Sequence, residues 1–424
     1  MKTIRYKSFI TLAAFLSLIF ASCSKKTSSE QTFKPNLEKD TKAKIYIAGN
    51  YKNFEALEAE FDRFNDFYPN VELFYSYLDN YKSTIKSAIA SDSAPDIYMT
   101  FPWMLDRPDY KDVIDSAEDM SSQDNLNFNL CSIRNQLFSK TNDGKISIIP
   151  VLSGSYGMLV NEDIFNNEKL PIPSNYQELV EACTKLKEKG YPSPLMAYVD
   201  NFISFPLIYA YFSKSIENSP EAVSHLNQFD SQAGQYIKPT LEWVQQFIEN
   251  DFINLNKCRT IKDKYNAVIM TFFEGNVPLM LCDTDTVSGT LKRESQSKDF
   301  INKPFKYSFH PFPALDQTNN FVNYVAVGFS VNKNSNNLPM ANEFMRFLIS
   351  TEELNNLAKI KRLITTSTDY SFDEIYASLS QNTPIYLNEN GLTDNAIAQI
   401  RSAVYQVLQN KMTVEEAINH FGKF

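Results

Sequence analysis

The sequence has few of the side chains on which metal sites and nucleophilic active sites usually depend. Among its 424 residues are three histidines, five cysteines and two tryptophans. His225, His310 and His420 lie far apart, and none has a cysteine or carboxylate partner at metal-ligand spacing. The sequence therefore predicts no metal site.

Four of the five cysteines also lack the spacing of a redox or metal motif. They form no CxxC pair, and each stands among apolar neighbours: Cys131, Cys183, Cys258 and Cys282. This pattern predicts buried free thiols, and no disulfide can be assigned from it.

Long basic runs are absent, and so is a second hydrophobic stretch after residue 21. The formal net charge is −9, and removal of residues 1–22, which carry three basic and no acidic side chains, makes it −12. A net acidic chain without a basic cluster lacks the surface that neutralises phosphates, so nucleic acid is excluded as a partner. About 400 residues remain, enough for two domains with cores of their own.

The only long apolar run lies at the N-terminus. Lys2, Arg5 and Lys7 precede the 13 apolar residues 9–21, which fit the hydrophobic region of a secretory signal. A membrane span would need about 20 residues. The run ends in Phe-Ala-Ser-Cys, which resembles the lipobox of bacterial lipoproteins, although Phe20 stands where that motif usually has Leu.

This pattern predicts a lipoprotein signal peptide over residues 1–22, lipidation of Cys23, and a flexible polar tether over 23–42. Such a protein would be anchored by lipid to the extracellular face of a bacterial cell membrane. A plain cleaved signal peptide and an uncleaved membrane anchor are the alternatives.

Alternation of strands and helices after the tether predicts an α/β fold. Strand patterns at 44–49, 71–77 and 97–101 are separated by helical patterns. This order favours a mainly parallel sheet with helices on its faces. Ligands of such sheets bind beyond the carboxyl ends of the strands, which are here the loops at 49–51 and 100–103.

The same kinds of pattern continue toward the C-terminus. Further strands are expected at 145–150, 156–160, 195–199, 277–282, 306–310 and 324–331. Helices are expected at 173–190, with Ser174 as the cap and Gly190 as the end, at 341–348 and at 397–408.

Residues 153–157, SGSYG, are one residue short of a nucleophile elbow, G-x-S-x-G. That motif needs a strand, a strained turn and a helix, followed by an acid and then a histidine. Here the pattern predicts strand on both sides, and no histidine has a fitting acidic residue before it. We therefore reject a catalytic serine in this segment. Residues 153–157 are either a ligand-binding segment or a turn that merely requires small residues.

Several short motifs, taken in order, resemble those of the family 1 extracellular solute-binding proteins of ABC importers, the group that includes maltose-binding protein. Each is weak alone, but together, behind a lipobox, they are specific. Tyr176 stands where the family's helix motif has Trp. The motifs span roughly residues 43–421: SAPDI at 93–97, GKISIIPVLSGSYGMLVNEDIF at 144–165, PSNYQELVEACTKLK at 173–187, FEGNVPLM at 273–280, the helix at 341–348 and TVEEA at 413–417.

The resemblance implies a two-lobe α/β fold of the periplasmic-binding-protein type, with a hinge and a central cleft. The N-lobe would hold residues 43–150 and 314–350. The C-lobe would hold residues 151–313 and 351–424. Two lobes joined by thin strands can close on a ligand by hinge motion.

The resemblance also places the crossovers between the lobes. The first would be 148–157, with Ser153 and Tyr156 facing the cleft, and the others would lie near Pro313 and Ser350. Each crossover would be thin enough to bend when the lobes close.

Sugar recognition has a physical signature: aromatic rings stack on pyranose C–H faces, and polar side chains bind hydroxyls. Trp103 at a strand exit is a candidate ring, with packing inside the lobe as the alternative. The resemblance makes Asp200 a hydroxyl acceptor and Phe202 an aromatic platform. The other candidates end strands or lie near a crossover: Asn50, Tyr51, Asp283, Asp285 and Tyr324.

Two departures from the family change the expected stacking. The family often has Trp at the position of Asp285. It also has a second platform Trp in the C-terminal helix, and in this sequence Ile397 lies near that position. The maltodextrin-like stacking mode is therefore not expected to carry over unchanged.

The expected function is a lipid-anchored receptor that captures a mono- or oligosaccharide and delivers it to the permease subunits of an ABC importer. It would act as a monomer, perform no chemistry and need no cofactor. One alternative is a binding protein for a non-sugar solute, such as a peptide, a polyamine or a phosphorylated compound. Another is a surface polysaccharide enzyme, for which Asp200 with Asp283 or Asp285 is the only carboxylate pair we can nominate.

Overall fold

The structure is a computed structural model that describes residues 33–105, 107–121, 130–141, 143–197, 203–216, 219–260, 267–313, 320–369, 371–387 and 391–424. The strands are β1 (Ala43–Gly49), β2 (Val71–Tyr77), β3 (Ile97–Thr100), β4 (Ile149–Asn161), β5 (Leu195–Met196), β6 (Leu279–Asp283), β7 (Tyr307–Pro311), β8 (Asn320–Val331), β9 (Ile364–Thr365) and β10 (Thr383–Tyr386).

The helices of the first lobe are α1 (Glu55–Asn65), α2 (Tyr81–Ile89), α3 (Lys111–Asp115), α15 (Leu338–Leu348) and α16 (Thr351–Lys361). Those of the second lobe are α5 (Glu162–Asn167), α6 (Tyr176–Glu188), α7 (Ser204–Leu207), α8 (Ser213–Ile216), α9 (Pro220–Gln228), α10 (Ala233–Glu249), α11 (Leu255–Thr260), α12 (Ile269–Phe273), α13 (Thr284–Arg293), α14 (Lys298–Asn302), α17 (Asp394–Leu408) and α18 (Val414–His420).

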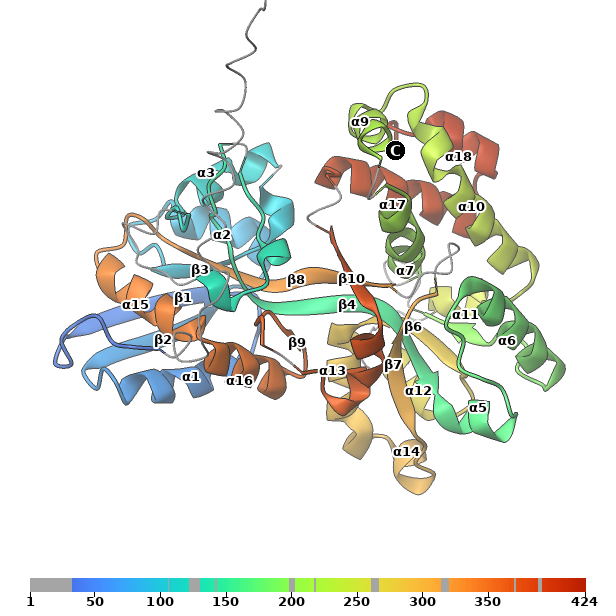
Figure 1. Ribbon diagram of the computed structural model, residues 1–424, viewed down its shortest axis with the longest axis horizontal. Helices are drawn as coiled ribbons and strands as arrows, with labels where there is room; N and C mark the ends of the chain where they lie inside the picture. Colours follow the sequence, from blue (N-terminus) through green and yellow to red (C-terminus); the bar gives the residue numbers. More distant parts are fainter. Residues whose placement is uncertain are drawn as a thin grey trace, which may run out of the picture.

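Two lobes lie side by side, and the long strands β4 and β8 run through both of them (Figure 1). Apolar side chains form a separate core in each lobe. Ile47 of β1 and Phe344 of α15 belong to the first core, and Leu179 of α6 and Val404 of α17 belong to the second. The expected two-lobe α/β fold is confirmed.

The sheet has the strand order β2-β1-β3-β8-β4-β6-β5. Pairing is parallel between β1 and its neighbours β2 and β3, as expected, and between β5 and β6. It is antiparallel between β8 and both β3 and β4, and between β4 and β6. The expectation of a mainly parallel sheet therefore holds for β1, β2 and β3 and is wrong for β4 and β8, the two strands that run through both lobes (Figure 1).

The crossovers follow from the core to which each residue belongs. On β4, Leu152 packs in the first core and Met158 in the second. On β8, Val322 packs in the second core and Val327 in the first. The second crossover is thus β8 itself, and not the segment near Pro313.

The third crossover lies after α16 rather than before it. Leu354 and Leu357 of α16 and the following Leu363 are buried in the first core, whereas Ile364 packs with the second lobe. The expected boundary at residue 350 is therefore moved to 363–364. The motif that suggested it ends with α15, but the next helix packs against α1 in the same lobe.

The chain already contacts the first lobe from Phe33 onward. The ring of Phe33 lies 5.1 Å from that of Phe67 and 5.3 Å from that of Phe347. The amide of Asn36 donates to Glu343 Oε1 at 2.7 Å. Residues 33–42 are thus not the free tether that the polar composition predicted, because the apolar side chains within that stretch dock on the core.

Local signals explain several helix ends. Helix α6 is capped by Asn175, which accepts a hydrogen bond from the amide of Glu178, rather than by Ser174. Gly190, with φ of +100°, follows it as expected. Cys183, Cys258 and Cys282 are buried free thiols, as expected, whereas Cys131 is only half-buried, which corrects the expectation of a buried side chain there. Within the described ranges, no helix is both long and apolar enough to cross a bilayer.

Candidate functional site

A buried arginine fastens the three crossovers to one another. Arg134 Nη2 donates to Ser153 Oγ on β4 at 3.0 Å and to Asn323 Oδ1 on β8 at 3.2 Å. Its Nη1 donates to the carbonyl of Ser367 in the third crossover at 3.1 Å, and its amide donates to the carbonyl of Thr366 at 2.9 Å. The guanidinium thus connects every segment that joins the lobes.

Ser153 is part of this hinge and does not face a cleft. Its side chain is fully buried, and its hydroxyl donates to the carbonyl of Ile364 at 3.1 Å while it accepts from Arg134. The expectation that Ser153 contacts ligand is therefore wrong. The serine satisfies a buried hydrogen-bond network, which explains a small polar residue at this position.

The next residue, Gly154, lies directly beneath an aromatic ring. A Cβ at Gly154 would lie 2.6 Å from Cζ of Tyr324 and 2.8 Å from Oγ1 of Thr284, closer than real contacts allow. The Tyr324 hydroxyl hydrogen-bonds to the Thr284 side chain, and burial raises the pKa of Tyr324 well above its ordinary value. Glycine is thus required here by the close approach of Tyr324 on β8 and Thr284 on α13.

Tyr156 and Tyr324, both expected at the site, lie against each other. Their ring centroids are 4.6 Å apart, and Phe205 of α7 stacks on the other side of Tyr156 at 4.9 Å with an interplanar angle of 3°. Arg401 of α17 places its Cζ 3.9 Å from the centroid of Phe205. We call Tyr324, Tyr156, Phe205 and Arg401 the aromatic column.

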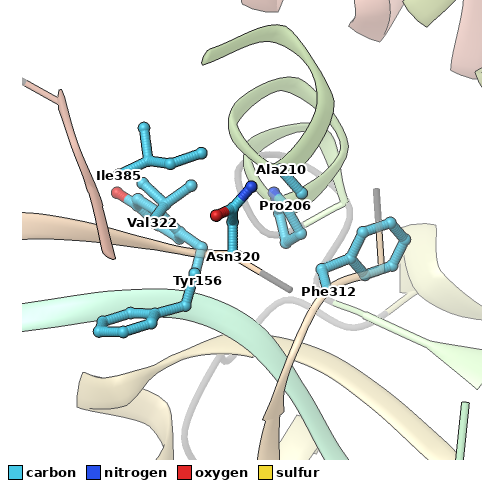
Figure 2. A pocket seen from close by; sticks show the side chains of 8 residues that line it. Tyr156, Pro206, Ala210, Phe312, Asn320, Val322 and Ile385 are labelled. Atoms are coloured by element: carbon cyan, nitrogen blue, oxygen red, sulfur yellow. The ribbon is translucent and has the colours of Figure 1, made fainter. Parts of the chain in front are cut away.

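The space beside this column is too narrow for a water-sized molecule. It lies between β4 and β8 on one side and the helix that begins with α7 on the other (Figure 2). Its lining residues are Tyr156, Pro206, Ala210, Phe312, Asn320, Phe321, Val322 and Ile385. A ligand could enter here only if these elements moved apart.

The two acidic candidates after β6 differ in role. Asp283 is buried and caps α13, because its Oδ1 accepts from the amide and the hydroxyl of Thr286 at 2.8 and 2.7 Å. Asp285, in the first turn of α13, is only half-buried. Asp283 therefore stabilises a helix, and Asp285 is the acid with a side chain that solvent can reach.

At the end of β1 the structure adds a residue that the sequence did not suggest. Asn50 is exposed, and Tyr51 is half-buried. Lys361, the last residue of α16, holds its Nζ 3.7 Å from the centroid of the Tyr51 ring. Burial lowers the pKa of Lys361, and the neighbouring Lys292 lowers it further.

Trp103 lies at the end of β3 in a group of rings and cations. Its ring stacks on Phe101 at 6.0 Å and meets Tyr110 edge-on at 5.0 Å. Lys82 Nζ lies 5.0 Å from its centroid and Arg107 Cζ 5.7 Å. Trp103 is half-buried, so packing occupies part of its surface and leaves part accessible.

Not every predicted residue can be placed. Asp200 and Phe202 lie outside the described residues. A roomier pocket of about 330 Å³ lies between α16 and the third crossover, and none of the predicted residues lines it. Its lining residues are Asn355, Ala358, Lys359, Leu363, Ile364, Thr365, Asp369, Ser371, Phe372, Asp373 and Tyr376.

Sequence reasoning missed Arg134, Phe205, Lys361 and Arg401. For Arg401 a signal existed, because it is the only charged residue in the amphipathic run 397–408. For Arg134 and Lys361 no local pattern distinguishes them from surface cations, since their partners lie far away in sequence.

Solved structures with the same arrangement of lobes support the fold. The apo-form of RafE from Streptococcus pneumoniae matches with a TM-score of 0.72 and 16% identity over 91% of this chain and 98% of that one. The GacH receptor of Streptomyces glaucescens matches with a TM-score of 0.69 and 15% identity over 90% and 97% of the two chains. A family 1 extracellular solute-binding protein from Bifidobacterium longum subsp. infantis gives 0.64 and 19% over 90% and 98%. At such identities the likeness shows the fold alone.

Sequence comparison defines the family. No curated protein sequence matches significantly. The family profile described as bacterial extracellular solute-binding protein, however, matches residues 48–354, well over half of the chain. The protein is therefore a member of the bacterial extracellular solute-binding proteins.

Proposed function

We propose that this chain is the receptor of an ABC importer and captures a mono- or oligosaccharide in a cleft between its two lobes. The observation that carries the proposal is the concentration of aromatic rings and polar side chains where the lobes are joined, around Tyr51, Tyr156 and Tyr324. Ring faces can remove the C–H face of a pyranose from water, at about 25 cal/mol per Å² of buried area. Proteins of the same fold support it: RafE is known in complex with raffinose, and GacH in complex with acarbose.

In this proposal each lobe contributes its own contacts. Tyr51 and Trp103 act from the first lobe, with Asn50 as a polar neighbour. Asp285, together with Asp200 and Phe202, acts from the second. Tyr156 and Tyr324 form the floor at the hinge, and Ser153 and Asp283 hold the surrounding backbone.

The proposal includes the surroundings of the receptor. Cys23 carries the lipid that holds the protein on the extracellular face of the cell membrane. The protein acts as a monomer and passes its ligand to the membrane-embedded permease subunits. It performs no chemistry on the ligand and needs no cofactor.

A thermal-shift screen over mono- and oligosaccharides tests the proposal. A ligand present at 100 times its dissociation constant should add about 2.7 kcal/mol of stability. Each saccharide that stabilises the protein is then incubated with it and analysed by chromatography. Stabilisation with an unchanged saccharide supports a receptor, whereas cleavage products would indicate an enzyme, and stabilisation only by peptides, polyamines or phosphorylated compounds would indicate a different solute.

A further inference from the structure

The ammonium of Lys361 lies at the meeting point of the lobes, and none of the acids that the structure describes forms an ion pair with it. It is half-buried, with Nζ 3.7 Å from the ring centroid of Tyr51 and 5.7 Å from that of Phe54. No ion pair joins it to any residue within the described part of the chain.

Both lobes approach this lysine. Tyr51 directly follows β1 of the first lobe. The hydroxyl of Ser288, on α13 of the second lobe, donates to the Lys361 carbonyl at 2.7 Å. Asp285, one turn earlier on α13, acts electrostatically on the ammonium. A ligand held between Tyr51 and α13 would therefore come within reach of Nζ.

The surroundings leave this charge incompletely compensated. Burial lowers the pKa of Lys361, Lys292 lowers it further, and the opposing effects of Asp285 and Glu55 are smaller. The Tyr51 ring replaces only part of the hydration that the ammonium has lost. An anionic group at this place would form a charge-assisted hydrogen bond with an ammonium that is already positioned.

We propose that Lys361 binds a carboxylate of the ligand, so that the captured saccharide contains a hexuronate residue. This inference rests on the proposed capture of carbohydrate and specifies its substrate class. Tyr51 would contact the pyranose face, and Asp285 would accept a hydroxyl of the same or the adjoining unit. The net charge of −9 gives an anion no long-range attraction, so its recognition depends on a local cation such as this one.

Titration calorimetry with matched saccharides tests the inference. Each pair consists of a neutral di- or trisaccharide and the same compound with one hexose oxidised to the hexuronate. In the wild-type protein, at least one uronate should bind tenfold or more tightly than its neutral partner. Lys361→Met should abolish that advantage, and Lys361→Arg should retain most of it. Lys359→Met removes an exposed lysine two positions earlier on the same helix and serves as the matched control, with the advantage unchanged.

The outcomes separate this inference from the proposed function. If neutral saccharides bind as tightly as their uronates, or if Lys361→Met keeps the uronate preference, the inference is wrong and carbohydrate capture stands. If neither member of any pair binds, the proposed function fails with it. Should Lys361→Met not fold, Lys361→Gln, which keeps a polar side chain without the charge, replaces it with the same expected loss.

Discussion

Arg134→Met should loosen the hinge without disturbing either core. The arginine side chain donates three hydrogen bonds, to Ser153, Asn323 and the carbonyl of Ser367, at 3.0 to 3.2 Å. Methionine keeps the length of the side chain only as far as the position of Nε, and it has no donors. The change therefore removes the links among the crossovers while it keeps the packing of the unbranched stem.

The expected cost can be worked out from the acceptors left behind. Ser153 keeps its own hydrogen bond to Ile364, so its loss is small. Asn323 Oδ1 and the Ser367 carbonyl each lose a charged donor, and a buried polar group without a partner costs about 1–3 kcal/mol. Together these give about 2–6 kcal/mol, reduced by the desolvation of the guanidinium that the variant no longer requires. Against a typical stability of 5–15 kcal/mol this is a large fraction.

Urea denaturation gives the free energy of unfolding, and limited proteolysis reports on the crossovers. Arg134→Met should lower the unfolding free energy by about 2 kcal/mol or more, consistent with the loss of two buried partners. It should also expose cleavage sites within β4, β8 or residues 363–367. Arg107→Met, at a half-exposed arginine paired with Asp109 on the surface, is the control and should cost about 1 kcal/mol at most. Wild-type stability and an unchanged proteolysis pattern for Arg134→Met would refute the view that this guanidinium holds the crossovers together.

Three further predictions concern the ligand, the anchor and pH. Trp103→Ala and Asp200→Ala should each weaken saccharide binding at least tenfold, which corresponds to about 1.4 kcal/mol, as measured by calorimetry. A large drop in the melting temperature of ligand-free Trp103→Ala would instead show that the ring only packs the lobe. Cys23→Ala should release the protein from the membrane fraction. If Cys23 of the wild-type protein is found without a lipid, for example in a disulfide, the proposed lipid anchor is wrong. Burial raises the pKa of Glu60 to about 9 from an ordinary 4.5. Between pH 4.5 and pH 9 the folded state therefore holds a proton that the unfolded state releases, and the free energy of unfolding falls as the pH rises. Glu60→Gln should therefore raise the melting temperature more at pH 8 than at pH 5, and the exposed Glu58→Gln on the same helix should show no such difference.

The lobes could be predicted from sequence because their elements are locally encoded. Strands β1, β2 and β3 coincide with short apolar runs, and α1 and α15 follow the helical period. The start of β8 could not be predicted, since Asn320 to Asn323 is not an apolar run and forms strand through its pairing with β4 and β10. The position of α16 likewise depends on its contact with α1, far away in the sequence.

The residues of the site likewise divide into those that local sequence patterns predict and those that they do not. Tyr156 and Tyr324 could be nominated because they follow from strand position, and the structure brings them into contact. Ser153 was misplaced because its partner, Arg134, cannot be identified by any local pattern. The capping role of Asp283 was not predicted, although an acid immediately before a helix is an N-cap signal that the sequence contains.

Closure of the lobes on a saccharide is the central claim, and small-angle scattering tests it most directly. The wild-type protein is measured alone and with a saccharide that calorimetry has shown to saturate it. Because β4, β8 and the segment at 363–364 are the connections between the lobes within the described residues, a ligand held between the lobes should draw them together, and the radius of gyration should decrease. An unchanged radius of gyration at full saturation would contradict capture by closure.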